Sequence, residues 1–126
     1  MNSETLRVLI LEDEQSVRGS VITFFKDCGW QVSEAVSAED GFQKLKVEKP
    51  HGAVVDICLP DVDGEAFIRK AAGKFPDLAL IILTGSLDYS IPEDIAALPQ
   101  VCEEVFRKPL YDLGILLEAL QSRIGG

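Results

Sequence analysis

Short apolar runs alternate with longer amphipathic segments along the chain, and this alternation constrains the fold more than any other feature of the sequence. Continuous apolar runs occur at residues 8–11, 53–55 and 78–83, as expected for strands that are buried on both faces. Two weaker runs, at residues 31–36 and 104–107, include charged residues. Strands of this kind, separated by helical segments, predict a mostly parallel sheet with helices on both of its faces.

The segments between and after these runs carry apolar residues at helical spacing. Their ends are marked by residues that typically start or stop helices, namely serine, glycine and proline. The predicted helices are a stripe from Val17 to Cys28 that stops at Gly29, a segment that Ser37 caps and Pro50 ends, residues 67–75 closed by Pro76, a short helix within residues 91–98 with Pro92 in its first turn, and residues 113–124.

The apolarity of the five strands predicts their order in the sheet. The three most apolar runs are expected at the centre, and the two runs that contain charged residues are expected at the edges. With right-handed crossovers, the simplest strand order is 2-1-3-4-5, which is the flavodoxin-like, doubly wound α/β arrangement. In this arrangement ligands bind at the carboxyl ends of strands 1 and 3, where the winding reverses.

Residues that can carry chemistry follow four of the predicted strands. They are Glu12, Asp13 and Glu14 after the first, Asp56 at the end of the third, Thr84 at the end of the fourth and Lys108 after the fifth. Carboxylates that lie close together repel each other, which favours a bound cation. Mg²⁺ is typical of such a site because it binds carboxylates, water and phosphate oxygens.

A carboxylate beside a metal can act as a nucleophile toward phosphorus and give an aspartyl phosphate. Asp56 is the predicted nucleophile, with Lys108 and Thr84 supplying a positive charge and a hydrogen bond to the phosphoryl oxygens. Each residue also has a purely structural interpretation, since Asp13 can cap a helix, Thr84 can end a strand and Lys108 can be a solvated lysine. Their joint occurrence at four strand ends favours the functional interpretation.

Composition limits the partners and the compartment. The formal net charge of −9 argues against nucleic-acid binding by this domain. Three cysteines without a CxxC pair, and a single histidine, predict neither a disulfide scaffold nor a zinc site. No apolar run approaches the roughly 18 residues of a membrane span, and residues 1–7 lack a signal-peptide core. We therefore expect one soluble, cytoplasmic domain over residues 1–126, with a core from about residue 7 to 124.

Over nearly its whole length the chain resembles the receiver domains of two-component response regulators. Four motifs carry the resemblance, in order and at fitting spacing. They are the acidic pair Glu12-Asp13, the segment from Asp56 to Gly64 with its Leu-Pro and closing Asp-Gly, the pair Thr84-Gly85, and the pair Lys108-Pro109.

The resemblance implies a role for each of these residues. Asp56 accepts a phosphoryl group from a sensor histidine kinase, a phosphotransfer protein or a small phosphodonor. Asp13 binds Mg²⁺ directly, Glu12 binds it directly or through water, and Asp56 and the backbone carbonyl of Cys58 complete the protein ligands. Thr84 and Lys108 then contact the phosphoryl group. The domain is thus a signalling switch, whose only catalysis is its own phosphorylation and slow dephosphorylation, and it acts on a downstream effector, with a homodimer as an open possibility.

The sequence departs from the family pattern at two places. Three positions before the lysine the family usually has an aromatic residue that reports activation, and Val105 occupies that position here. Phe106 is expected to face the core, because neighbouring residues in a strand point to opposite faces. Residues 88–101 also lack the glycine-alanine step that usually precedes the fifth strand, so the fourth helix is expected to be short or displaced.

Three other interpretations compete with a phosphorylated receiver. The pair Asp61 and Asp63 is superficially similar to the aspartates of haloacid-dehalogenase-type phosphatases, but Leu59-Pro60 separates it from the strand. The spacing of a calcium loop also fails, so turn formation and helix capping by the two aspartates are favoured. The main alternative is a pseudo-receiver, an interaction module of the same fold that is never phosphorylated.

Overall fold

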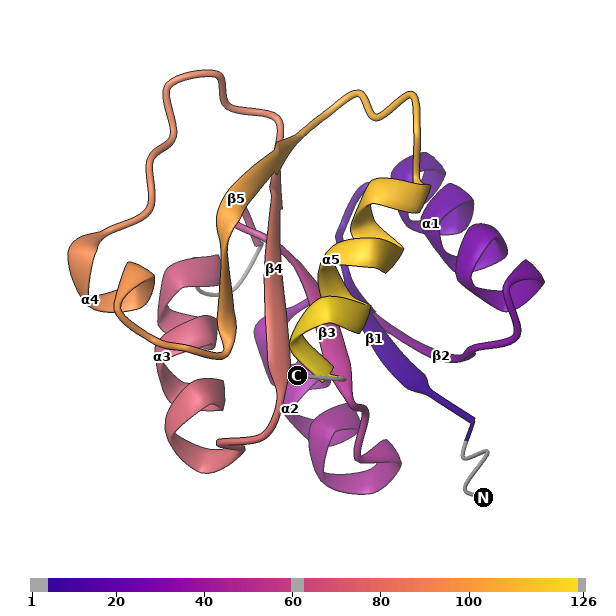
Figure 1. The fold of residues 1–126 in the computed structure, drawn as a ribbon, viewed down its shortest axis with the longest axis horizontal. Coiled ribbons are helices and arrows are strands. Elements are labelled where there is room, and N and C mark those ends of the chain that lie inside the picture. Colours follow the sequence, from indigo (N-terminus) through magenta and orange to yellow (C-terminus); the bar gives the residue numbers. More distant parts are fainter. Residues whose placement is uncertain (1–4, 60–62, 125–126) are drawn as a thin grey trace.

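Five parallel strands form one sheet in the computed structural model, which describes residues 5–59 and 63–124. The strands are β1 (Arg7–Leu11), β2 (Gln31–Ala35), β3 (Gly52–Asp56), β4 (Ala79–Thr84) and β5 (Val101–Arg107), in the order β2-β1-β3-β4-β5 (Figure 1). The predicted strand order is therefore confirmed, with the two charged strands at the edges. The described helices are α1 (Gln15–Asp27), α2 (Ala38–Glu48), α3 (Gly64–Lys74), α4 (Glu93–Ala96) and α5 (Gly114–Ile124).

The helices cover both faces of the sheet, and the sheet separates the core into two layers (Figure 1). On one face, Val8 and Ile10 of β1 pack with residues of α1 and α5. On the other face, Leu9 and Leu11 pack with residues of α2, α3 and α4. This alternation follows from the two-residue period of a strand, whose successive side chains point to opposite faces. No helix in the described part of the chain is long and apolar enough to cross a membrane.

Side-chain caps begin two of the helices, as the sequence predicts. The Ser37 side chain accepts a hydrogen bond from the Asp40 backbone N–H at 3.2 Å, at the start of α2. The Asp63 side chain accepts one from the Ala66 N–H at 2.7 Å, at the start of α3. A capping aspartate also complements the positive end of the helix dipole. The similar role expected for Asp61 lies outside the described residues.

The ends of α1 separate two interpretations of the acidic segment. Glu14 is the N-cap residue and its side chain makes no capping hydrogen bond. The capping interpretation of Asp13 is therefore wrong, because Asp13 lies one residue too early to cap the helix.

At the C-terminal end of α1 the chain turns at Gly29, whose φ of 91° is a left-handed conformation that favours glycine.

The region after β4 differs from prediction at two element boundaries. β5 begins at Val101, three residues before the predicted start, because Val101 pairs with Leu80 on the buried side of the edge strand. Pro92 lies at the N-cap of α4 with a ψ of 150°, so its backbone is extended and not yet helical. α4 is therefore a single turn, in agreement with the expected short helix. Phe106 is buried, as predicted.

Candidate functional site

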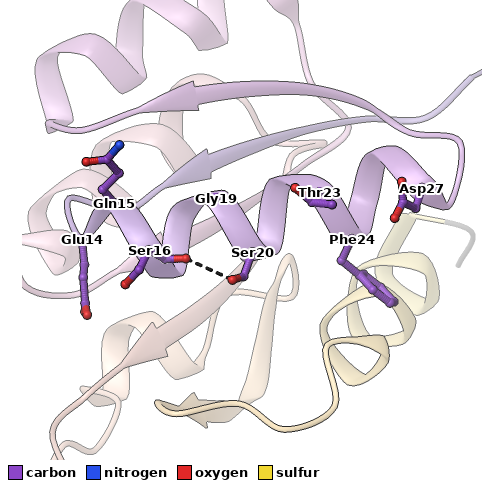
Figure 2. A pocket seen from close by; sticks show the side chains of 8 residues that line it. All are labelled: Glu14, Gln15, Ser16, Gly19, Ser20, Thr23, Phe24 and Asp27. Carbon is purple, nitrogen blue, oxygen red and sulfur yellow. Dashed lines mark hydrogen bonds between the residues drawn. The ribbon is translucent and has the colours of Figure 1, made fainter.

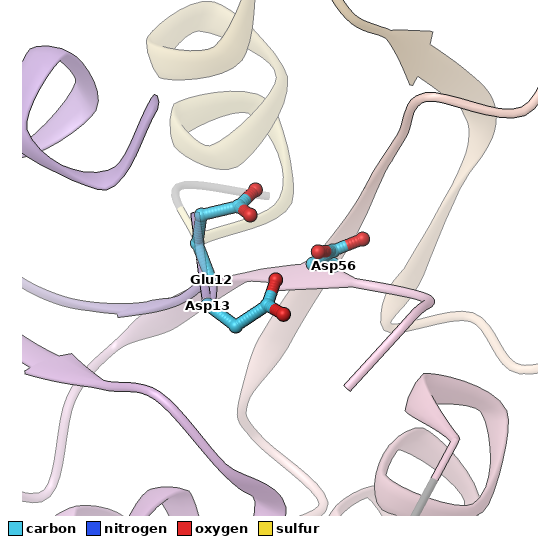
Figure 3. A group of neighbouring side chains, drawn as sticks. All are labelled: Glu12, Asp13 and Asp56. Atoms are coloured by element: carbon cyan, nitrogen blue, oxygen red, sulfur yellow. The ribbon is translucent and has the colours of Figure 1, made fainter. Parts of the chain in front are cut away.

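Three carboxylates meet at the carboxyl end of the sheet. Glu12 and Asp13 follow β1, and Asp56 is the last residue of the adjacent strand β3. One carboxylate oxygen from each residue lies within 4.8 Å of those of the other two, and the three side chains point toward a common space (Figure 3). Asp13 is exposed, whereas Glu12 and Asp56 are 0% and 3% exposed. The topology thus brings together the acidic residues that the sequence singled out.

Lys108 supplies the positive charge at this site. Its Nζ donates to both oxygens of Glu12, at 3.0 and 3.1 Å, and lies 3.5 Å from Asp56 Oδ2. It also lies 3.6 Å from Glu14 Oε1. One ammonium group therefore faces several carboxylates, which leaves the site with excess negative charge. Such a set of hard oxygen donors fits a cation such as Mg²⁺.

Burial and neighbouring charges shift the pKa values of Glu12 and Lys108. Burial raises the pKa of Glu12 to about 7, since the hydrogen bonds from the Glu14 N–H and from Lys108 only partly offset it and the charge of Asp56 adds to it. Burial by itself lowers the pKa of Lys108, but pairing with Glu12 and the charges of Asp56 and Glu14 outweigh it and raise the pKa. Burial is the largest cause of the Glu12 shift, and the charges of neighbouring carboxylates add to both shifts.

The loop after β3 fixes the position of Asp56. The Cys58 backbone N–H donates to Asp56 Oδ1 at 3.1 Å. A Cβ at Gly64 would lie 2.5 Å from the Asp56 carbonyl oxygen and 2.6 Å from Ile57 Cα, so only glycine fits there. The Gly64 N–H donates to the Ile57 carbonyl at 2.7 Å, which closes the loop. Residues 60–62 of this motif lie outside the described part of the chain.

Thr84 ends β4, the strand that neighbours β3. It is buried, and its Oγ1 accepts a hydrogen bond from the Ser86 N–H at 3.1 Å. Its backbone carbonyl accepts one from the Lys108 N–H at 2.8 Å, which ties the ends of β4 and β5 together. Thr84 and Lys108 therefore lie at the same edge of the sheet as the acidic group, as predicted.

Sequence reasoning missed Arg18, an arginine of α1 that holds the acidic segment. Its Nη1 donates to the carbonyl oxygens of Glu12 at 3.0 Å and Asp13 at 3.4 Å. Its Nε donates to Glu34 Oε1 of β2 at 3.0 Å. The available signal was an arginine one helical turn after the acidic run, but its partner on β2 is visible only in the fold.

Sequence reasoning also missed the contacts that hold the loop between β4 and α4. Arg107 donates to the carbonyl oxygens of Ser86 at 2.5 Å and Tyr89 at 2.8 Å. The Tyr89 hydroxyl donates to Glu65 Oε2 of α3 at 2.8 Å. Burial, together with this hydrogen bond, raises the pKa of Tyr89 above its ordinary value. The loop that follows Thr84 is thus tied to both β5 and α3.

A shallow hollow runs along the outer surface of α1 from the edge of the acidic site (Figure 2). It begins at Glu14, whose carboxylate contacts Lys108. Small and polar side chains line most of it. The lining residues are Glu14, Gln15, Ser16, Gly19, Ser20, Thr23, Phe24 and Asp27.

Comparisons with known sequences identify one family. The family model of the response regulator receiver domain matches residues 8–121. The chain is 33% identical to the KDP operon transcriptional regulatory protein KdpE of Escherichia coli, over 93% of the chain and 48% of that protein. It is 28% identical to the virulence transcriptional regulatory protein PhoP of Shigella flexneri, over 96% of the chain and 54% of that protein. The chain thus spans about half the length of these relatives.

Comparisons with solved structures agree on the fold. A receiver domain from Methanospirillum hungatei, described as CheY-like, superposes with a TM-score of 0.83 at 26% identity, over 97% of this chain and 95% of that one. The response regulator TrrA of Thermotoga maritima, solved in complex with Mg²⁺ and beryllofluoride, gives a TM-score of 0.78 at 20% identity, over 92% and 99%. At that identity, the second likeness concerns the fold alone.

Proposed function

The chain belongs to the response regulator receiver domain family of two-component signalling, and on that premise we propose that Asp56 accepts a phosphoryl group in a Mg²⁺-dependent reaction. One observation carries the proposal. Carboxylate oxygens of Glu12, Asp13 and Asp56 gather within 4.8 Å, and the Lys108 ammonium lies 3.5 Å from Asp56. The domain is proposed to comprise residues 1–126 and to act as a signalling switch. Its proposed catalysis is limited to its own phosphorylation and slow dephosphorylation.

The residues at the site fit a Mg²⁺ ion. Asp13, Asp56 and Glu12, the last directly or through water, would hold it together with the backbone carbonyl of Cys58. When bound, the ion neutralises charge on the phosphoryl oxygens. TrrA, a protein of the same fold, was solved in complex with Mg²⁺ and beryllofluoride, which supports this assignment.

Phosphoryl transfer uses the Asp56 carboxylate as the nucleophile. A carboxylate oxygen forms a bond to phosphorus while the phosphorus–nitrogen bond of a phosphohistidine breaks, and the released imidazole nitrogen takes up a proton. The Cys58 N–H and the packing of Gly64 hold the carboxylate in place for this step. Lys108 and the Thr84 hydroxyl then bind oxygens of the new phosphoryl group.

The donor is proposed to be a sensor histidine kinase or a phosphotransfer protein. Such a protein must contact the surface around Asp56, and the hollow along α1 provides an accessible surface that starts at Glu14 (Figure 2). Downstream, the aspartyl phosphate biases an equilibrium between inactive and active forms, which an effector domain or protein reads. KdpE and PhoP, which the chain matches over about half their length, are transcriptional regulatory proteins. This supports an effector that regulates transcription.

The test is intact-protein mass after incubation with acetyl phosphate, with and without Mg²⁺, for the wild type and for Asp56→Asn. A Mg²⁺-dependent gain of one phosphoryl group that the variant lacks is the expected result. Absence of this gain, together with no Mg²⁺-dependent binding of beryllofluoride, would favour the pseudo-receiver. The pseudo-receiver alternative is favoured by one observation, which is that Val105 occupies the position where the family usually has an aromatic residue.

A further inference from the structure

A second cavity lies at the opposite edge of the sheet from Asp56. It has a volume of about 390 Å³ and lies beside the amino ends of β3 and β4, between the last turns of α2 and α3. Its apolar wall includes Leu45, Phe75 and Leu78, which are buried or half-buried. This volume lies within the roughly 300–1,000 Å³ typical of small-molecule sites.

Three lysines surround this apolar wall. Lys46, Lys49 and Lys74 all line the cavity and are exposed. The chain has 21 acidic residues and only 12 lysines and arginines, yet none of the described carboxylates pairs with these three ammonium groups. Asp77 is the one acidic residue among those that line the cavity. An acidic protein therefore keeps a local excess of positive charge at this place.

Capping hydrogen bonds from the lysines themselves do not account for this charge, although Lys46 and Lys74 lie in the last turns of α2 and α3. Lysines near a helix C-terminus often bind its last carbonyl groups. Here Arg7 binds the Glu48 and Lys49 carbonyl oxygens, at 2.8 to 3.1 Å. On the α3 side, Gln100 Nε2 binds the carbonyl oxygens of Phe75 and Leu78, at 3.0 and 2.8 Å. The three exposed ammonium groups are thus not the donors to these carbonyl oxygens, and they are accessible to a ligand.

The backbone conformation at Lys49 is a further observation in favour of a role for its positive charge. Lys49 has a φ of 49° and a ψ of 59°, a left-handed conformation at the C-cap of α2. Glycine or asparagine is usual at such a position, because a Cβ makes it less favourable. A lysine there lowers stability relative to glycine while adding a positive charge beside the cavity.

We propose that this cavity binds a small organic anion with an apolar body, of the class of aliphatic or aromatic carboxylates. The apolar body packs on Leu45, Phe75 and Leu78, and the carboxylate faces Lys46, Lys49 and Lys74. Binding there is independent of Asp56, which lies at the other end of β3. The chain therefore carries a ligand site in addition to its phosphoacceptor site.

The experiment uses octanoate as the probe and octan-1-ol as its uncharged match. Amide chemical shifts of the ¹⁵N-labelled protein are followed during titration with each compound. Octanoate is expected to shift the amides around Lys49 and Leu78 saturably, with an affinity at least about fivefold higher than that of octan-1-ol. Equal affinity for the two compounds, or no saturable shift with octanoate, overturns the proposal.

Variants assign the effect to the lysines. Lys49→Gly removes a charge and relieves the left-handed backbone, so the fold is retained. Each of Lys49→Gly and Lys74→Gln is expected to weaken octanoate binding about threefold to fivefold, as an exposed ion pair contributes modestly. Lys26→Gln is the control, because Lys26 also lies in the last turn of a helix but on α1. Unchanged binding in the first two variants, or an equal loss in the control, contradicts the assignment.

Discussion

At the scale of single residues, the site depends on how Lys108 and Arg18 contact the acidic segment after β1, in which Glu12 is buried and Asp13 is exposed. Glu12 is fully buried, and Lys108 is the cation that its carboxylate contacts. Arg18 acts on the same segment from the other side, through the backbone carbonyls of Glu12 and Asp13. A buried carboxylate without a charged partner is strongly unfavourable, so loss of Lys108 should affect stability as well as function. Arg18 contacts backbone carbonyls of the segment, so its loss should affect the position of the metal ligands.

Lys108→Ala should still accept a phosphoryl group on Asp56 but fail to transmit the change. The variant keeps the nucleophile and the metal ligands, but it loses the cation that would bind the new phosphoryl oxygens. It should also be less stable by about 1–3 kcal/mol, since Glu12 loses its charged hydrogen-bond partner. Intact mass measures acceptance, and amide chemical shifts with beryllofluoride measure the response. A variant that shows the full wild-type shifts would falsify the role assigned to Lys108.

Arg18→Ala should weaken Mg²⁺ binding about tenfold, because groups that orient metal ligands typically affect affinity to this degree. Calorimetric titration with Mg²⁺ measures the effect. Arg18→Lys should restore part of the affinity, since lysine can reach one carbonyl but not make both contacts. Arg123→Ala is the control, because Arg123 also donates to a backbone carbonyl, that of Pro99, far along the chain. An equal loss of affinity in both alanine variants contradicts a specific role for Arg18.

At the scale of elements, two loops at the carboxyl end of the sheet are held by different means. The loop after β3 is held by close packing, since Gly64 at the start of α3 allows the backbone to approach Asp56. The loop after β4 is held by side chains, since Arg107 and Tyr89 tie it to β5 and α3. The close packing at Gly64 fixes the acceptor. The loop after β4 is held by side-chain hydrogen bonds, and we expect that these can break without unfolding the sheet.

Gly64→Ala should both destabilise the fold and slow phosphorylation. Its Cβ would meet backbone atoms at 2.5 and 2.6 Å, so the loop that carries Asp56 must shift. We expect a loss of about 2–3 kcal/mol, as for overpacking elsewhere, measured by urea unfolding. Gly73→Ala is the matched control in the same helix, where a Cβ has no neighbour within 4 Å. That control should gain about 1 kcal/mol from helix propensity, and a loss there would count against the argument.

Arg107→Ala should loosen the loop between β4 and α4 while leaving the sheet intact. The variant loses the two hydrogen bonds to the Ser86 and Tyr89 carbonyls. Amide hydrogen exchange should become about tenfold faster at residues 86–91, because local opening then competes with fewer contacts. Amides of β3 and β4 should exchange as in the wild type. Unchanged exchange in the loop would show that Tyr89 and its bond to Glu65 suffice to hold it.

At the scale of the whole molecule, the sheet separates two sites of opposite charge. Carboxylates gather at the carboxyl ends of β1 and β3, and three lysines surround the cavity at the amino ends of β3 and β4. A ligand that binds only the folded state raises its stability according to its concentration and affinity. The proposed metal site can therefore be tested through the stability of the entire fold.

Mg²⁺ together with beryllofluoride should stabilise the wild type by about 2.7 kcal/mol when the free ligand is at a hundredfold excess over its Kd. Thermal unfolding with and without EDTA measures this difference. Asp56→Asn should lose the beryllofluoride-dependent part, and Asp13→Asn should lose most of the metal dependence. Equal stabilisation of all three proteins would indicate non-specific binding of the ion to an acidic surface.

Much of the fold and the main site residues could be predicted from the sequence. A strand that is buried on both faces has a continuous apolar run. The runs that contain Val8, Ala53 and Leu80 therefore identify the three central strands from the sequence alone. The carboxyl ends of parallel strands lie at one edge of a sheet. The sequence therefore predicted that Asp56 lies close to Glu12 and Asp13, as the structure shows. The start of β5 at Val101 was missed because edge pairing, and not periodicity, decides it.

The tertiary structure alone decided which atoms meet. Lys108 and Glu12 are 96 residues apart, and only packing shows that the lysine contacts Glu12 more closely than Asp56. The same holds for Arg18 with Glu34, for the closeness of Gly64 to Asp56, and for the three lysines around one cavity. Local patterns in a sequence report the period and burial of one element, whereas distances between elements depend on how all the side chains between them pack.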